Sequence, residues 1–269
     1  MNAFLQLLKA AGAHPPVGTW IGSASPIVAE AIRCAGFDWG LVDMEHSPLD
    51  VMNLVHVLQA LAGTKLVPVV RVPWNDAVIV KRVLDAGATT LMYPFVQNAD
   101  EARRAVAATR YPPEGIRGLA GTTRAARFGT TPNYFKTANQ QIGVIVQIET
   151  PATIEQLDAI AAVDGIDALF VGPADLSAAM GHIGNVAHPA VMDRLSHVVQ
   201  RCKELGKPVG TLGGTPELVA QYRATGFDFV AVSSDIGLMM RSAQAAIAAL
   251  RTRDTEHVHT LASGTASTY

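Results

Sequence analysis

The chain has 269 residues, of which 49% are hydrophobic and 16% are charged, and its formal net charge is −2 at pH 7. This composition excludes a disordered chain and is typical of a globular protein with a large core. The small negative charge argues against nucleic acid or an anionic membrane as the main partner. We expect one barrel-sized domain over 1–251 and a polar, Ser/Thr-rich disordered tail over 252–269, although the length also allows two small domains.

The N-terminal segment and the cysteines bear on the cellular compartment. Residues 1–12 have the pattern of a short amphipathic helix without a basic leading region, and Gln6 and Lys9 interrupt its apolar run, so we expect no signal peptide. No segment approaches the roughly 20 apolar residues that a membrane span needs. Cys34 and Cys202 lie in separate helical patterns, which favours two buried thiols over a disulfide. The expected location is the cytoplasm.

Eight apolar, strand-like runs follow one another along the chain, separated by helical patterns that often end in Gly. Most runs are continuously hydrophobic, as expected for parallel strands that are covered on both faces. Eight strand–helix repeats predict an α/β fold of the (β/α)8 barrel type. A doubly wound open sheet is the alternative, because the number of strands does not prove closure. The runs lie at 17–21, 39–43, 66–71, 90–93, 143–149, 168–172, 209–212 and 229–233.

One interval, 111–142, breaks this rhythm with clusters of Pro, Gly and Thr and with Arg117, Arg124 and Arg127. Loops of this length in compact domains are usually functional or disordered, and the arginines and aromatic residues favour an ordered loop. It either contributes to an active site, with Arg124 as a candidate substrate contact, or forms an interface or solvated loop.

Polar side chains gather at the carboxyl ends of the predicted strands, the face on which barrel enzymes place their active sites. Glu149 ends the fifth run, and Asp175 follows the sixth run across a Gly-Pro turn, so the two carboxylates are expected to converge on one pocket. Mg²⁺-type sites use one or two carboxylates and complete their coordination with water and substrate oxygens. The alternative is that both acids begin helices.

The second and third runs end in groups suited to proton transfer and anion binding. His46 follows Asp43 and Glu45, and a histidine oriented by a carboxylate is a recurrent general base. Alone, however, such a histidine more often has a structural role. Arg71 ends an apolar strand, where its charge needs an anionic partner. It either pairs with Asp43 or holds a substrate oxyanion.

The remaining strand ends favour metal-assisted carbonyl chemistry. In the turn from Gly172 to Asp175, the N–H groups of Ala174 and Asp175 form a natural carboxylate cradle, to which Pro173 contributes no donor. No lysine ends a predicted strand, which disfavours a Schiff-base enzyme.

The motifs VDMEHSPLD, PVVRVPWND, YPPEGIRG, VQIET and FVGPADLSAAMGHIGN occur in this order along the chain. With these motifs, residues 15–250 resemble the HpcH/HpaI aldolases, a family of class II pyruvate-dependent aldolases. The resemblance implies a (β/α)8 barrel whose last helix is swapped between partners in a hexamer, a trimer of dimers.

The resemblance also implies a site. A divalent cation (Mg²⁺, Mn²⁺ or Co²⁺) would bind to Glu149 and Asp175 and hold pyruvate. His46 matches the family's catalytic histidine, and Arg71 matches its enolate-stabilising arginine. Acids grouped with the histidine are Asp43 and Asp85, and the implied substrate contacts are Gln147, Gly172, Pro173, Ala174, Asp175 and Leu212. The role of Asp85 rests on the resemblance alone.

The expected reaction is reversible cleavage of a 4-hydroxy-2-oxo acid to pyruvate and an aldehyde. The substrate would derive from a dicarboxylate or a sugar acid, such as 4-hydroxy-2-oxoheptanedioate or 5-dehydro-4-deoxy-glucarate. One alternative is a related lyase of the pyruvate/phosphoenolpyruvate superfamily that acts on a CoA thioester. Another is a non-catalytic barrel, against which the retained strand-end residues argue.

Overall fold

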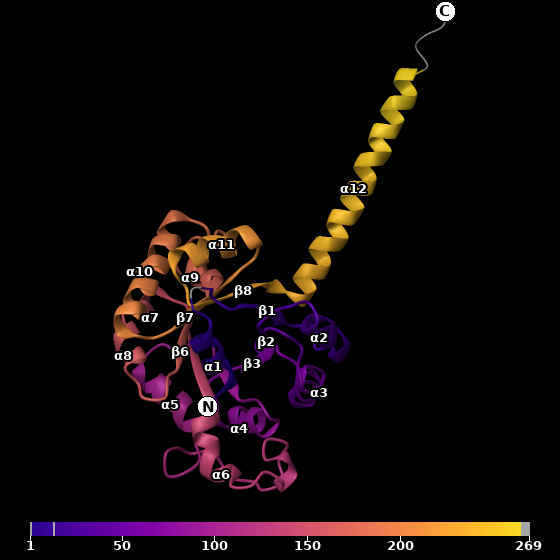
Figure 1. Ribbon diagram of the computed structural model, residues 1–269. Helices are drawn as coiled ribbons and strands as arrows, with labels where there is room; N and C mark the ends of the chain where they lie inside the picture. Colours follow the sequence, from indigo (N-terminus) through magenta and orange to yellow (C-terminus); the bar gives the residue numbers. More distant parts are fainter. Residues whose placement is uncertain (1, 13, 265–269) are drawn as a thin grey trace, which may run out of the picture.

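Figure 1 shows a computed structural model of the chain, which describes residues 2–12 and 14–264. Eight parallel strands pair in sequence order, and β8 pairs with β1, so the sheet is a closed barrel. This confirms the predicted (β/α)8 barrel and excludes the open sheet. The strands are β1 (Val17–Ile21), β2 (Trp39–Asp43), β3 (Val67–Arg71), β4 (Thr90–Tyr93), β5 (Gly143–Ile148), β6 (Ala168–Val171), β7 (Val209–Gly213) and β8 (Phe229–Ser234).

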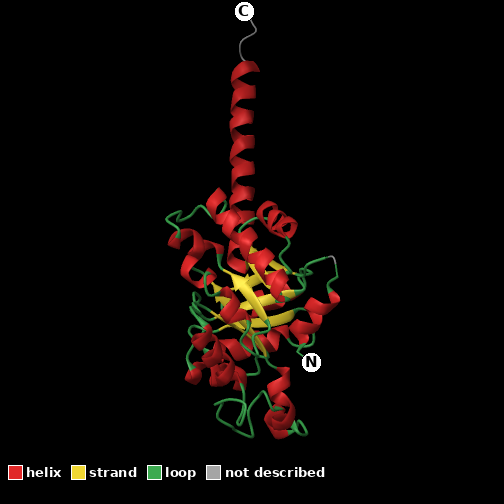
Figure 2. Ribbon diagram, turned by 90° about the vertical axis from the view of Figure 1, so that its left-hand side faces the viewer, coloured by secondary structure: helices red, strands yellow, loops and turns green. Residues whose placement is uncertain are grey.

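The helices surround the strands (Figure 2), and side chains cap many of them. Asp50, Asp76 and Asn98 each accept a hydrogen bond from a first-turn N–H, which fixes where three helices begin. Helix α1 (Ala3–Ala10) covers the amino end of the barrel. Around the barrel lie α2 (Pro26–Arg33), α3 (Val51–Leu61), α4 (Ala77–Asp85), α5 (Ala99–Thr109), α7 (Pro151–Ile154), α8 (Leu157–Ala161), α9 (Pro173–Ala179), α10 (Pro189–Leu205) and α11 (Pro216–Thr225). The long interval folds into short helices η1 (Arg127–Gly129), α6 (Tyr134–Thr137) and η2 (Ala138–Gln141).

Two apolar cores result, one between strands and helices and one inside the barrel. Trp39, Phe170 and Phe229 fill the barrel interior. Phe4 of α1 closes its amino end, with its ring centroid 5.7 Å from that of Trp39 and 5.2 Å from that of Phe229. Because aromatic side chains block that end, only the carboxyl end of the barrel remains for a site.

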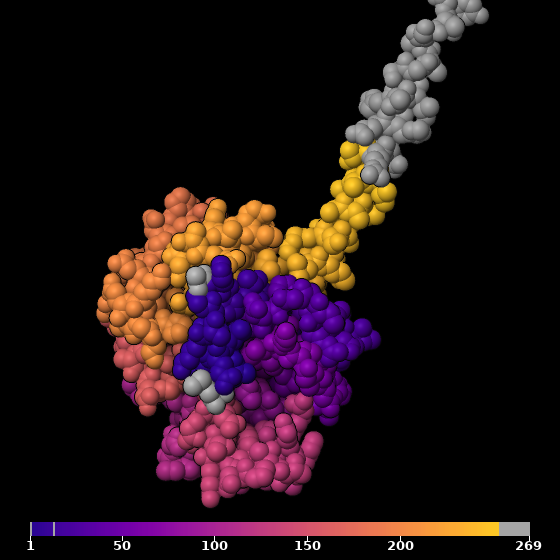
Figure 3. Space-filling model, in the orientation of Figure 1, coloured from indigo at the N-terminus to yellow at the C-terminus, as the bar shows by residue number. Residues whose placement is uncertain are grey.

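Helix α12 (Asp235–Gly264) extends away from the barrel (Figures 1 and 3). Its exposed apolar side chains include Ile236, Met239, Met240, Ile247 and Leu250. The helix after β8 therefore leaves its own barrel, and its exchange between partners stays a prediction. Helix α12 includes residues 252–264, and residues 265–269 lie outside the described residues. The disorder expected over 252–269 stays a prediction.

The thiol prediction is half wrong. Neither cysteine forms a disulfide, but only Cys202 is buried, and Cys34 is exposed. Cys34 is the C-cap of α2 and therefore lies beyond the apolar face of that helix. Among the helices of the described residues, none combines the length and the apolar character that crossing a membrane requires.

Candidate active site

A cavity of about 710 Å³ opens at the carboxyl end of the barrel. Its lining comes from the ends of seven strands, as in barrel enzymes generally. It brings together predicted site residues that are far apart in sequence: Asp43, His46, Arg71, Gln147, Gly172, Pro173, Ala174, Asp175 and Leu212. Among the described residues, no lysine lines this cavity.

Arg71 is buried at one side of the cavity and is held by two acids. Its Nε and Nη2 donate to the two carboxylate oxygens of Asp43 at 2.9 and 2.8 Å, and its Nη1 lies 2.8 Å from Oε2 of Glu45. Burial tends to raise the pKa of Asp43, but the hydrogen bonds and charge of Arg71 outweigh it and hold that pKa below its usual range. The ion pair anticipated from sequence is therefore present, and it fixes the guanidinium against the cavity.

Glu45 is a site residue that sequence reasoning did not select. The Nε2 of His46 lies 3.7 Å from Oε2 of Glu45, while the His46 side chain is 66% exposed at the cavity wall. Burial raises the pKa of Glu45, against the opposing charges of Arg71 and His46. Its position directly before the predicted histidine was the signal that could have identified it. Glu45, rather than Asp43, is the acid whose carboxylate faces the imidazole.

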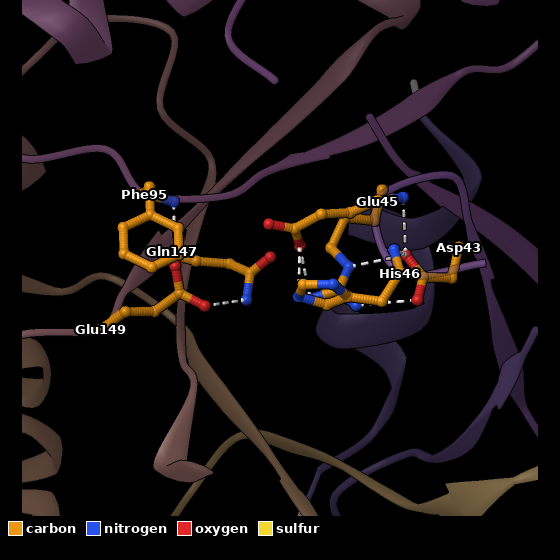
Figure 4. Close-up of polar contacts among 7 residues, drawn as sticks. Asp43, Glu45, His46, Phe95, Gln147 and Glu149 are labelled. Atoms are coloured by element: carbon orange, nitrogen blue, oxygen red, sulfur yellow. Dashed lines mark hydrogen bonds and ion pairs between the residues drawn. The ribbon is translucent and has the colours of Figure 1, made fainter. Parts of the chain in front are cut away.

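Glu149 lies across the cavity from this group (Figure 4) and is almost fully buried, with 1% exposed. Its Oε1 accepts from Nε2 of Gln147 at 2.8 Å, and its Oε2 accepts from the backbone N–H of Phe95 at 2.9 Å. Burial raises the pKa of Glu149 to about 7, against the Phe95 hydrogen bond, and the nearby carboxylate of Asp175 raises it further.

The residues around Glu149 fit a hard divalent cation. Asp175 is close enough for its charge to raise the pKa of Glu149, so bringing both acids together ionised is unfavourable without a cation. Oε1 of Gln147 is buried and has no hydrogen-bond partner among the described residues. Gly172 leaves room beside Glu149, since a Cβ there would lie 2.7 Å from its Oε1. In the described part of the chain, no cluster of three or more His, Cys, Asp or Glu offers a protein-only cage. A Mg²⁺-type site needs only one or two carboxylates, which Glu149 and Asp175 supply.

Two predicted residues lie elsewhere in this chain. Asp85, at the end of α4, accepts from Nη2 of the buried Arg117 at 2.7 Å. Arg124, in the long interval, donates to the backbone carbonyl of Ala86 at 2.8 Å. Neither lines the cavity of its own chain. The interval 111–142 thus packs on the end of α4, and the catalytic and substrate roles assigned to Asp85 and Arg124 stay predictions.

Known proteins share both this fold and this sequence pattern. The chain is 51% identical over 238 residues to 2-dehydro-3,6-dideoxy-6-sulfogluconate aldolase of Pseudomonas putida, covering 88% of this chain and 93% of that relative. It is 49% identical over 228 residues to 5-keto-4-deoxy-D-glucarate aldolase of Salmonella arizonae, covering 85% and 89%. A crystal structure of an HpcH/HpaI aldolase/citrate lyase family protein from Burkholderia cenocepacia superimposes with a TM-score of 0.89 at 41% identity, covering 93% of this chain and 100% of that chain.

These relatives are named aldolases, and the site lies at the strand ends of a closed barrel. The protein is therefore a carbon–carbon lyase of the aldolase type, which acts on small molecules. A family model described as HpcH/HpaI aldolase/citrate lyase matches residues 17–242, and the chain belongs to this family. The resemblance drawn from the motifs is confirmed, and a non-catalytic barrel is set aside.

Proposed function

We propose that the protein is a metal-dependent class II aldolase that cleaves a 4-hydroxy-2-oxo acid, derived from a sugar acid, to pyruvate and an aldehyde. The observation that carries this proposal is the buried carboxylate of Glu149 beside Asp175, opposite Arg71, in a cavity that no described lysine lines. A Schiff-base route needs a lysine at the carbonyl carbon. An acid pair instead suits a cation as the electrophile.

The cation would be Mg²⁺, Mn²⁺ or Co²⁺, held by Glu149 and Asp175. When bound, it would polarise the C2 carbonyl of the substrate and offset the negative charge that develops as the C3–C4 bond breaks. Gln147 holds Glu149 through its 2.8 Å hydrogen bond, which keeps the carboxylate in a single orientation.

Arg71 supplies fixed positive charge to the enolate. A guanidinium has five N–H donors. Asp43 accepts one hydrogen bond from Nε and one from Nη2, and Glu45 forms an ion pair with Nη1. One N–H on Nη2 and those on Nη1 are therefore not used by Asp43. Because two acids hold the group rigidly, these remaining donors are preorganised to stabilise the developing oxyanion.

His46 accepts the proton of the C4 hydroxyl as the C3–C4 bond breaks, and it returns this proton to C3 of the enolate to give pyruvate. The imidazolium that forms is stabilised by Glu45, whose Oε2 lies 3.7 Å from Nε2. At the start of α9, the N–H groups of Ala174 and Asp175 are not used by the helix and would hold the substrate carboxylate. Leu212 lines the cavity and would limit the shape of the substrate.

We further propose that the chain works as a hexamer in which α12 is exchanged between partners. The exposed apolar side chains of α12 support this, because apolar patches on isolated chains usually mark interfaces. Since Asp85 and Arg124 do not line their own cavity, any role of theirs in the reaction would be exerted on the cavity of a neighbouring subunit. Mixing His46→Ala and Asp85→Ala chains tests this: regained activity requires that the two residues act across subunits.

Pyruvate release from a panel of 4-hydroxy-2-oxo acids tests the proposed reaction directly. The panel should include uncharged, carboxylated and sulfonated aldehyde halves, because the two relatives described above are named for carboxylated and sulfonated sugar acids. We expect cleavage of at least one sugar-acid member with Mg²⁺, Mn²⁺ or Co²⁺. Cleavage of CoA thioesters alone would overturn the proposal.

A further inference from the structure

Phe95, which follows β4 and Pro94, has an unusual backbone conformation. Its φ angle is +50°, a region that bulky L-residues rarely adopt and that the surrounding structure must enforce. In this conformation its N–H donates to Oε2 of Glu149 at 2.9 Å. The strained residue is therefore one of the two that orient the buried acid of the site, together with Gln147.

The Phe95 ring is stacked on Trp74, which lies in the loop between β3 and α4. The ring centroids are 6.3 Å apart and the planes are inclined by 29°. Trp74 is 57% exposed and does not line the substrate cavity, so neither burial nor substrate contact accounts for its position. The two rings instead border a separate cavity of about 220 Å³. The stack joins the β3 loop to the β4 loop outside the active site.

The same β4 loop is also tied on its other side. Oε1 of Gln97 accepts from the hydroxyl of Thr153 at 2.9 Å, which fixes the loop to the segment just after Glu149. The Gln97 N–H donates to Oε2 of Glu101 at 2.8 Å. These bonds hold the loop at Gln97, which lies two residues after Phe95. At Phe95 itself, the ring is in contact with Trp74, and this stack is placed to oppose relaxation of the strained backbone.

We propose that Trp74 is a positioning residue for the metal site: its stack holds Phe95 in the left-handed conformation and thereby keeps the Phe95 N–H on Glu149. This rests on the proposed function, in which Glu149 is a metal ligand. Without the stack, the backbone at Phe95 relaxes toward negative φ, the N–H turns away, and Glu149 loses one of its two fixed partners. Residues that orient metal ligands typically change metal affinity when they are substituted.

The test is a calorimetric titration of the metal-free full-length protein with Mn²⁺, for the wild type, Trp74→Ala and Trp74→Phe. We expect Trp74→Ala to weaken Mn²⁺ binding about three- to tenfold, the range of a lost aromatic stack, and Trp74→Phe to restore most of it. Val78→Ala is the matched control, because Val78 is an apolar residue 63% exposed on the following helix. It should bind Mn²⁺ as the wild type does.

Two further measurements separate positioning from a general loss of structure. In metal-free protein, Trp74→Ala should speed amide hydrogen exchange in a peptide covering residues 94–98, while peptides from β1 and β8 stay unchanged. In a Phe95→Gly background, Trp74→Ala should change Mn²⁺ affinity no further, since glycine adopts positive φ without strain and carries no ring to stack.

Wild-type protein that does not bind Mn²⁺ would refute the metal role in the proposed function, and this inference with it. Wild-type protein that binds Mn²⁺, with Trp74→Ala equal to it in affinity and in exchange at 94–98, would refute the positioning role alone.

Discussion

The guanidinium of Arg71 is shared between two acids, with Glu45 at 2.8 Å from its Nη1 atom. The same oxygen of Glu45 lies 3.7 Å from Nε2 of His46. One carboxylate therefore links the group proposed to stabilise the enolate with the group proposed to move the proton. A change at Glu45 should disturb both functions, although Glu45 does not line the cavity.

Glu45→Gln should lower kcat/KM for the cleaved substrate about 10- to 100-fold, the effect typical of residues that orient a catalytic group. The amide keeps the shape of the side chain and removes the charge that faces Arg71 and His46. Steady-state kinetics measure the change. Glu30→Gln, on an exposed acid paired with Arg33, is the control and should stay within about twofold. Full activity of Glu45→Gln would show that Asp43 alone positions Arg71.

Metal removal should abolish cleavage. EDTA-treated protein should release no pyruvate, and added Mn²⁺ should restore the activity. Borohydride added together with pyruvate should leave the restored activity intact, because no described lysine lines the cavity to form a reducible imine. Cleavage by EDTA-treated protein at the untreated rate, or inactivation by borohydride, would contradict the proposed chemistry.

The pKa of Glu149 makes the stability of the metal-free protein depend on pH. In the folded protein this pKa is about 7, against an ordinary value of 4.5. Between these values the folded state binds a proton that the unfolded state does not. The stability from Glu149 is therefore full below pH 4.5 and is lost as the pH rises through about 7.

Glu149→Gln removes this titration. The free energy of unfolding of the wild type, relative to that of Glu149→Gln, should fall between about pH 5 and pH 8 in EDTA. Urea titrations of both proteins at each pH measure it. A difference that stays constant across this range would show that Glu149 titrates normally.

Asp235 ties the end of β8 to the loop after β1. Its Oδ1 accepts from the N–H of Gly22 at 3.1 Å and its Oδ2 from the N–H of Ser23 at 3.1 Å, and the side chain is 4% exposed. Asp235→Ala removes the charged acceptor of two half-buried N–H donors at the seam of the barrel. It should cost about 2–4 kcal/mol of unfolding free energy. Urea denaturation measures the cost, with exposed Asp100→Ala as a control within about 0.5 kcal/mol.

The exposed apolar face of α12 predicts the assembly state. Ile247→Asp places a charge on a side chain that is 49% exposed in the single chain. If α12 packs on a partner, this change should dissociate the oligomer, which analytical ultracentrifugation of the full-length protein measures. The control is Ile27→Asp, on a side chain of α2 that is 79% exposed. It should leave the mass of the oligomer unchanged. An unchanged mass for Ile247→Asp would place the interface on another surface.

Much of the fold is predictable because buried parallel strands have a local signature. The run at 39–43 is apolar up to its terminal acid, and β2 has these bounds. The ends of such strands also identify His46 and Arg71. The Phe95 N–H leaves no trace in sequence, because every residue except proline carries that donor. Glu45 stands directly before the predicted histidine, but its contact with Arg71 forms only when the barrel brings β2 and β3 together.

The Phe4 plug at the amino end of the barrel has a consequence for how the chain folds. Phe4 is among the first residues synthesised, yet it packs on Phe229 in the last strand. Its burial therefore waits until nearly the whole chain is available. Contacts of such long sequence separation slow folding, because the intervening loop must lose its entropy first. We expect the amino end of the barrel to close late, and α1 to remain accessible to proteases until β8 has joined the sheet.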